Sequence, residues 1–126
     1  MHDTSYVAKT YHKLTCPFSF KFLLFMTEAG LLDQIDVVRC DPNAGDFEAI
    51  RDRLTDTTGR KASFPTVEVE PGVYMSESDD LIHYYADRNG ISADDFEVLD
   101  WYKAGLFPRV IGMHREIREL KEQIEQ

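Results

Sequence analysis

Strand-like and helix-like spacings of apolar residues alternate along the first part of the chain. The β-forming residues from Ser5 to His12 predict a first strand, which the segment 15–17 closes. Pro17 suits the first turn of a helix, because its missing N–H would be unpaired there, and the apolar spacing predicts a helix over 17–29. The β-branched run over 35–40 predicts a second strand, so the order begins β-α-β.

The next segment predicts a second helix, a hairpin and a third helix. Apolar residues from Asp46 recur at helical spacing up to a breaker at 57–59. Two short β-rich runs over 64–69 and 73–75 flank a Pro-Gly turn and predict an antiparallel hairpin. Ser76 and the acidic residues after it suit the start of a helix that ends near Gly90. The resulting β-α-β-α-β-β-α order predicts an α/β protein with at least one parallel strand pair.

The last third of the chain predicts a helical extension. The segments 93–106 and 108–124 are both patterned as helices, with Pro108 at the start of the second. Ile117, Leu120 and Ile124 follow a 3-4 spacing that would suit a pairing seam between helices. We therefore expect one domain over residues 1–90 and an extension over 91–126 that packs on it, with a possible homodimer through the C-terminal helices.

Composition narrows the classes of function. The 126 residues, 43% of them apolar, suffice for one core. A formal net charge of -9 argues against nucleic acid, whose phosphates need clustered cations. No stretch reaches the ~20 apolar residues of a membrane span, and the N-terminus has no apolar signal core. We therefore expect a cytoplasmic protein with no membrane contact.

The two cysteines are the candidate reactive groups. Cys16 directly precedes the predicted helix, where unpaired backbone amides and the helix dipole favour a thiolate, and Lys13 adds a nearby cation. Cys40 ends a predicted buried strand, which favours a structural role. The histidines show no zinc-like spacing with Cys16, so we expect no metal.

Three segments carry a resemblance to a known family. Residues 13–19, Lys-Leu-Thr-Cys-Pro-Phe-Ser, resemble the active-site segment of glutaredoxins and of cysteine-type glutathione transferases such as the omega class. Phe64-Pro65-Thr66 resembles the cis-proline turn of that superfamily, and Ser76-Glu77-Ser78 resembles the motif that holds the γ-glutamyl end of glutathione. The similarity covers residues 5–89. It implies a thioredoxin-like α/β fold, a four-stranded mixed sheet with flanking helices plus the C-terminal helical extension.

The resemblance also implies roles for single residues. Cys16 would be catalytic, with glutathione as co-substrate, and Lys13 would hold the glycyl carboxylate. The backbone of Phe64 would pair with the cysteinyl part of glutathione, in the way that an added strand pairs with a sheet edge. The start of the third helix would receive the γ-glutamyl end. The residues expected to contact glutathione are Lys13, Phe18, Phe64, Pro65, Glu77 and Ser78.

Ser19 decides between the mechanisms that such relatives use. It stands where dithiol relatives have a second cysteine, so the expected activity is monothiol thiol-disulfide exchange through Cys16 on a glutathionylated protein or a small disulfide. Two alternatives stay open. One is a non-catalytic glutathione-binding or protein-interaction module that uses the acidic segment 76–100 and the C-terminal helices. The other is a redox sensor that pairs Cys16 with Cys40.

Overall fold

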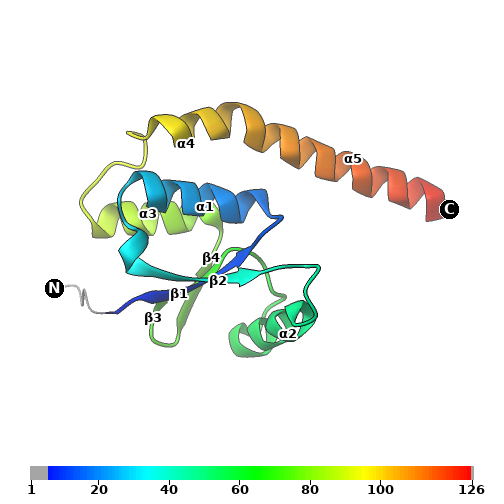
Figure 1. Ribbon diagram of the computed structural model, residues 1–126, viewed down its shortest axis with the longest axis horizontal. Helices are drawn as coiled ribbons and strands as arrows, with labels where there is room; N and C mark the ends of the chain where they lie inside the picture. Colours follow the sequence, from blue (N-terminus) through cyan, green and yellow to red (C-terminus); the bar gives the residue numbers. More distant parts are fainter. Residues whose placement is uncertain (1–5, 126) are drawn as a thin grey trace.

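The computed structural model describes residues 6–125, in which a four-stranded sheet lies between helices (Figure 1). The strands are β1 (Ala8–Lys13), β2 (Ile35–Cys40), β3 (Thr66–Glu70) and β4 (Val73–Ser76). The helices are α1 (Pro17–Glu28), α2 (Phe47–Thr58), α3 (Ser78–Arg88), α4 (Glu97–Trp101) and α5 (Phe107–Glu125). A 3₁₀ turn, η1 (Leu32–Gln34), precedes β2, and a π-helical turn, η2 (Tyr102–Leu106), joins α4 to α5.

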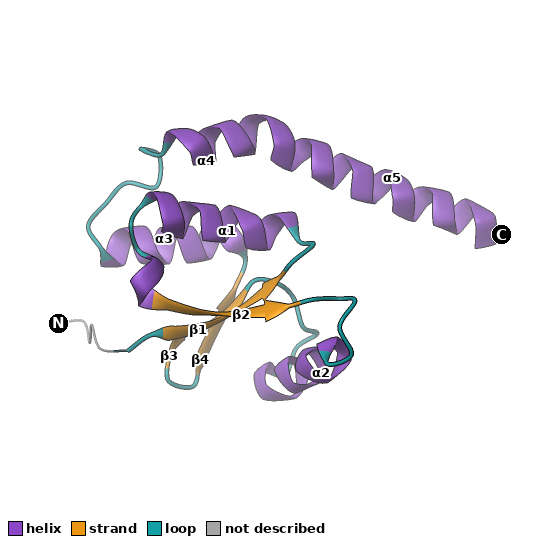
Figure 2. Cartoon of the chain, viewed as in Figure 1, coloured by secondary structure: helices purple, strands orange, loops and turns teal. Residues whose placement is uncertain are grey.

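The sheet has the order β2-β1-β3-β4 and mixed directions. β1 and β2 run parallel, with Ala8 opposite Ile35 and Lys13 opposite Cys40, whereas β3 is antiparallel to both β1 and β4. Helices α1 and α3 cover one face of the sheet and α2 covers the other (Figure 2). This arrangement confirms the predicted thioredoxin-like α/β fold.

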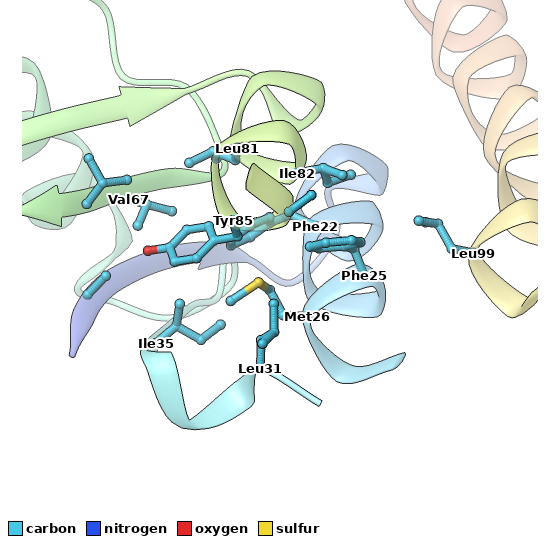
Figure 3. Close-up of a cluster of buried hydrophobic side chains, with 13 residues drawn as sticks. Phe22, Phe25, Met26, Leu31, Ile35, Val67, Leu81, Ile82, Tyr85 and Leu99 are labelled. Atoms are coloured by element: carbon cyan, nitrogen blue, oxygen red, sulfur yellow. The ribbon is translucent and has the colours of Figure 1, made fainter. Parts of the chain in front are cut away.

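Two groups of buried side chains hold the layers together. The larger one joins α1 and α3 to the sheet, and Figure 3 shows Phe22 and Met26 of α1 beside Tyr85 of α3. The smaller one contains Cys40, Ile50 and Leu54 and lies between β2 and α2. Burying an aliphatic or aromatic side chain contributes about 1.5–3 kcal/mol, so these clusters are the main source of stability.

Two boundaries in the domain differ from the prediction. The first strand begins at Ala8, while the predicted start at Ser5 lies outside the described residues. The third helix begins at Ser78, because Ser76 is still paired in β4 opposite Thr66. Glu77 stands between the strand and the helix with a φ of 73°, and its side chain makes no capping hydrogen bond.

The extension contains the second predicted helix, while the first is shorter than predicted. The predicted helix over 93–106 starts only at Glu97, since Ala93 and Phe96 pack against the core from a loop. Pro108 is the second residue of α5, as predicted, although η2 leads from α4 into α5 without a break. A proline removes one backbone hydrogen bond from a helix, and here it follows a turn whose pairing is already irregular.

The beginning of the extension is tied to α1 by specific hydrogen bonds. The Glu28 carboxylate accepts from the N–H groups of Val98 and Leu99, each at 2.8 Å. The Tyr102 hydroxyl donates to the Pro17 carbonyl at 2.7 Å. Beyond this anchor α5 extends past the domain, and none of its described residues is buried (Figure 1). Within residues 6–125, no helix has both the length and the hydropathy that crossing a membrane requires.

Candidate functional site

The thiol of Cys16 sits at the N-terminus of α1. Cys16 is the N-cap residue, and its sulfur accepts a hydrogen bond from the Ser19 N–H at 3.5 Å. Its S–H donates to the Phe64 carbonyl, also at 3.5 Å. The amide favours a negative sulfur, whereas the carbonyl is a partner for the protonated thiol. The side chain is partly exposed, so a disulfide in solution can reach it.

Ser19 cannot act on a ligand in the described conformation. It is completely buried, and its hydroxyl oxygen accepts a hydrogen bond from the Lys13 N–H at 3.3 Å. It therefore joins the end of β1 to the first turn of α1. Its hydroxyl is used in holding the segment that carries Cys16.

Phe64 and Pro65 form the other wall of the site. The peptide bond between them is cis, as the resemblance implied. Phe64 stacks on Phe47 at the start of α2, with the ring centroids 5.8 Å apart, and the Lys13 Nζ lies 5.8 Å from the centroid of the Phe47 ring. These contacts bring Lys13, Phe64 and Cys16 together from three elements.

A pocket of about 360 Å³, here called the Cys16 pocket, opens beside the thiol. Its floor is the segment from β1 to α1 and its roof is α5. The lining residues are Lys13, Thr15, Cys16, Pro17, Phe18, Ile111, His114, Arg115 and Arg118. Two expected glutathione contacts, Lys13 and Phe18, thus lie here, with cations of α5 added.

Glu77 lines a separate hollow, whereas Ser78, the next residue, is buried and does not line it. This Glu77 hollow, of about 200 Å³, includes Arg60, Lys61, Ser63 and Glu77 in its lining. The first hydrogen bond of α3 runs from the Leu81 N–H to the Glu77 carbonyl, so the amides of the first turn, including that of Ser78, are not used in the helix. Ser63 directly precedes Phe64, whose carbonyl contacts Cys16. The Glu77 hollow is thus connected to the Cys16 contact through two consecutive residues, Ser63 and Phe64.

Cys40 is placed differently from Cys16. It is completely buried in the smaller core cluster, its S–H donates to the Val38 carbonyl at 3.5 Å, and burial raises the pKa of its thiol. Both cysteines are free thiols. Among the described residues, no group of three or more histidine, cysteine, aspartate or glutamate side chains could hold a metal ion.

Sequence reasoning missed the contribution of α5. Ile111, His114, Arg115 and Arg118 recur at intervals of three and four, which marks one face of a helix. That spacing could have shown that these residues act together. Nothing in the sequence shows that the face turns toward Cys16, because the direction depends on how η2 leads from α4 into α5.

Lys21 was also missed. Its side chain is 5% exposed, and its Nζ contacts the Asp79 carboxylate at 2.8 Å and lies 4.5 Å from the centroid of the Phe107 ring. It therefore links α1 to α3 and to α5. The sequence does not show that Lys21 is buried, because its partners Asp79 and Phe107 lie far away along the chain.

Comparison with known proteins identifies the family. The family described as glutathione S-transferase, N-terminal domain, matches residues 15–88, which is more than half of the chain. The chain belongs to this family, and the expected relationship to thioredoxin-like glutathione proteins is confirmed. No curated protein sequence gave a significant match.

Solved structures similar to the chain cover about two thirds of it. A possible glutathione S-transferase from Rhodopseudomonas palustris matches with 23% identity and a TM-score of 0.48, over 68% of this chain and 41% of that one. Oxidized glutaredoxin 2 from Chlamydomonas reinhardtii matches with 28% identity and a TM-score of 0.49, over 69% and 76%. Glutaredoxin 2 from Salmonella typhimurium, solved in complex with glutathione, matches with 23% identity and a TM-score of 0.49, over 68% and 35%.

Proposed function

We propose that the protein is a glutathione-dependent thiol-disulfide oxidoreductase of monothiol type, with Cys16 as its catalytic residue and glutathione as its co-substrate. The observation that carries the proposal is a partly exposed thiol at a helix N-terminus beside a pocket whose lining, among the described residues, has cations and no carboxylate. Mixed disulfides of glutathione are anionic, and a cationic pocket beside the thiol favours an anionic substrate even in a protein of net charge -9.

The proposed reaction has two exchange steps. The Cys16 thiolate attacks the glutathione sulfur of a mixed disulfide, the S–S bond breaks, and the other thiol leaves with the electron pair and takes up a proton. The thiolate of a second glutathione attacks the glutathione sulfur now bound to Cys16. Oxidised glutathione leaves, and the Cys16 thiolate is restored. The net result is reduction of one mixed disulfide by one glutathione molecule, and Ser19 takes no part.

The glutathione half of the substrate would use both sides of the site. In the proposed pose, its γ-glutamyl end lies at the Glu77 hollow, where Ser78 begins α3, and its glycyl carboxylate faces Lys13. Phe64 and Pro65 would flank the central cysteinyl unit, and Phe18 would border the Cys16 pocket. The substrate would be a glutathionylated protein or a small disulfide, and the two free thiols suit a reducing, cytoplasmic compartment.

The test is reduction of a glutathionylated peptide by glutathione, followed through the oxidised glutathione formed. Wild-type protein should accelerate the reaction and Cys16→Ser should abolish the acceleration. Cys40→Ala is the matched control, and it should retain the activity because Cys40 is buried away from the pocket. If Cys16→Ser is as active as the wild type, or neither accelerates the reaction, the enzymatic proposal is wrong and a binding or interaction module takes its place.

Self-association through α5 is a further part of the proposal. Met113, Ile117, Leu120 and Ile124 follow alternating intervals of four and three and are 47%, 50%, 50% and 83% exposed. With about 100° of rotation per residue, this row faces away from the side that borders the Cys16 pocket. Glu116 and Lys121 flank the row in positions where they would attract each other between parallel copies. The occupant that we propose for this row is α5 of a second copy.

A further inference from the structure

The roof of the Cys16 pocket differs in charge from the rest of the molecule. Arg115, Arg118 and His114 enter it from α5, and Lys13 enters it from β1. Among residues 6–125, no aspartate or glutamate lines it, although the chain has 23 acidic residues against 14 lysines and arginines. Three of those cations, Lys13, Arg115 and Arg118, therefore line the pocket beside the partly exposed Cys16 thiol with no carboxylate among them.

Contacts between the start of α5 and the segment after Cys16 hold these cations beside the pocket. The Tyr102 hydroxyl is bonded to the Pro17 carbonyl, one residue after Cys16. The Phe107 ring meets Phe18 edge to face, with centroids 5.2 Å apart. Burial raises the pKa of Tyr102 and the charge of Cys16 raises it further, so this hydroxyl stays a donor at neutral pH. The first turn of α5 is thus fixed against the cysteine segment.

Charged side chains near the Cys16 thiol change the electrostatic potential that a disulfide substrate meets there. The overall negative charge repels anions at long range, but salt screens exposed charges beyond about 10 Å. Within that distance the charges of Lys13, Arg115 and Arg118, which line the pocket, make the potential that a substrate meets at Cys16 more positive. A carboxylate carried close to the disulfide would be attracted, and an ammonium group would be repelled.

We propose that Arg115 and Arg118 are specificity-determining residues that select mixed disulfides whose departing thiol carries a negative charge close to its sulfur. This inference rests on the proposed function, because it names the substrate class of the same site. The natural substrates would be glutathione mixed disulfides of acidic small thiols, or of protein cysteines with an adjacent acidic residue. Glutathione would occupy the side of Phe64 and Glu77, and the departing half would lie under α5.

The first test measures the field at the thiol without requiring catalysis. Iodoacetate and iodoacetamide have similar size and the same mechanism, but only iodoacetate is charged. The ratio of their alkylation rates at Cys16 cancels the thiolate fraction and reports the local potential. The Arg115→Gln/Arg118→Gln variant should lower the ratio about fivefold. The control Arg51→Gln/Arg109→Gln, which removes two arginines that do not line the pocket, should leave it unchanged. An equal ratio in all three proteins would overturn the inference.

The second test measures selection between substrates. The substrates are glutathione mixed disulfides with thioglycolate, 2-mercaptoethanol and cysteamine, whose departing thiols are negative, neutral and positive. Each kcat/KM is divided by the uncatalysed rate of the same disulfide with glutathione, because the departing thiols differ in pKa and a thiol of lower pKa leaves faster. The corrected values should fall in that order in wild type, and the Arg115→Gln/Arg118→Gln variant should bring them together. Equal values in wild type would overturn the inference and leave the proposed function intact.

Two other outcomes separate the two proposals. If the double variant lowers kcat/KM by the same factor for all three substrates, the arginines bind glutathione itself, and the inference is wrong. If no disulfide is reduced but the alkylation ratio still depends on the two arginines, the proposed activity fails, while selection of anions at Cys16 is supported.

Discussion

Ser19 illustrates how a single buried hydroxyl serves the site without touching a substrate. Ser19→Ala would leave the Lys13 N–H without its partner and should reduce the free energy of unfolding by about 1–2 kcal/mol. Because the monothiol route does not use Ser19, the rate of glutathionylated peptide reduction should fall by less than threefold. Chemical denaturation and the peptide assay test both parts. A loss of activity comparable to that of Cys16→Ser would show that the hydroxyl takes part in the reaction.

The ionisation of Asp79 makes the free energy of unfolding depend on pH in the acid range. The hydrogen bond from Lys21 lowers the pKa of this carboxyl, with burial acting in the opposite direction. A lowered pKa in the folded state stabilises the protein above the unfolded pKa of about 4 and loses that contribution as pH falls through the folded value. The carboxylate is 72% exposed, so its share is about 1 kcal/mol.

Because the pKa of Asp79 is lowered in the folded state, wild type and Asp79→Asn should differ in their free energy of unfolding in a way that depends on pH. Asp79→Asn should be less stable than wild type at pH 7, and the gap should close between pH 4 and pH 2. Urea unfolding at several pH values measures this. Asp80→Asn is the control, because Asp80 lies on the same turn and is also exposed. A gap that widens as the pH falls would contradict the interpretation.

At the level of residues, the sequence predicted the reactive thiol but not the side chains that surround it. Cys16 before Pro17 could be predicted as a helix N-cap thiol, because proline and helix amides have fixed local requirements. Arg118 and Lys21 could not be predicted as neighbours of the site. Their positions depend on contacts between elements distant in the sequence, which local spacing does not report.

The extension depends on Glu28 for its attachment to the domain. Its carboxylate accepts from two amides at the start of α4, where a negative charge also complements the helix dipole. Glu28→Ala should destabilise this attachment by about 1 kcal/mol. Hydrogen exchange at Val98 and Leu99 should then become several times faster, while exchange in β1 stays unchanged. Glu28→Gln, which keeps one acceptor oxygen, should be intermediate.

The elements of the sheet and α1 were predicted more accurately than the extension. β2 occupies 35–40 as predicted, because its three β-branched residues, Ile35, Val37 and Val38, are followed by a clear turn signal at 41–43. The predicted start at Ala93 was wrong, because Ala93 and Phe96 contribute apolar contacts from a loop. An apolar spacing of three therefore does not prove a helix when the segment connects two packed elements.

At the scale of the whole molecule, the apolar row on α5 predicts association. Wild type should elute as a dimer at micromolar concentration in size-exclusion chromatography with light scattering. Ile117→Glu/Leu120→Glu should shift the protein to a folded monomer, since both side chains are half exposed, and its unfolding midpoint should no longer depend on protein concentration. The control Glu119→Gln, which lies outside the row, should remain dimeric. A monomeric wild type at all concentrations would refute the proposed dimer.

The π-helical turn η2 has a consequence for how the chain tolerates change in length. Each residue of an α-helix advances the side chains by about 100°, so the number of residues between the Tyr102 anchor and Arg115 sets the rotational phase of α5. Deleting one residue of α5 before Arg115, such as Gly112, would turn every following side chain of the helix by that angle. The arginines would leave the thiol and another face would take their place. In this segment a one-residue change of length would matter more than most substitutions.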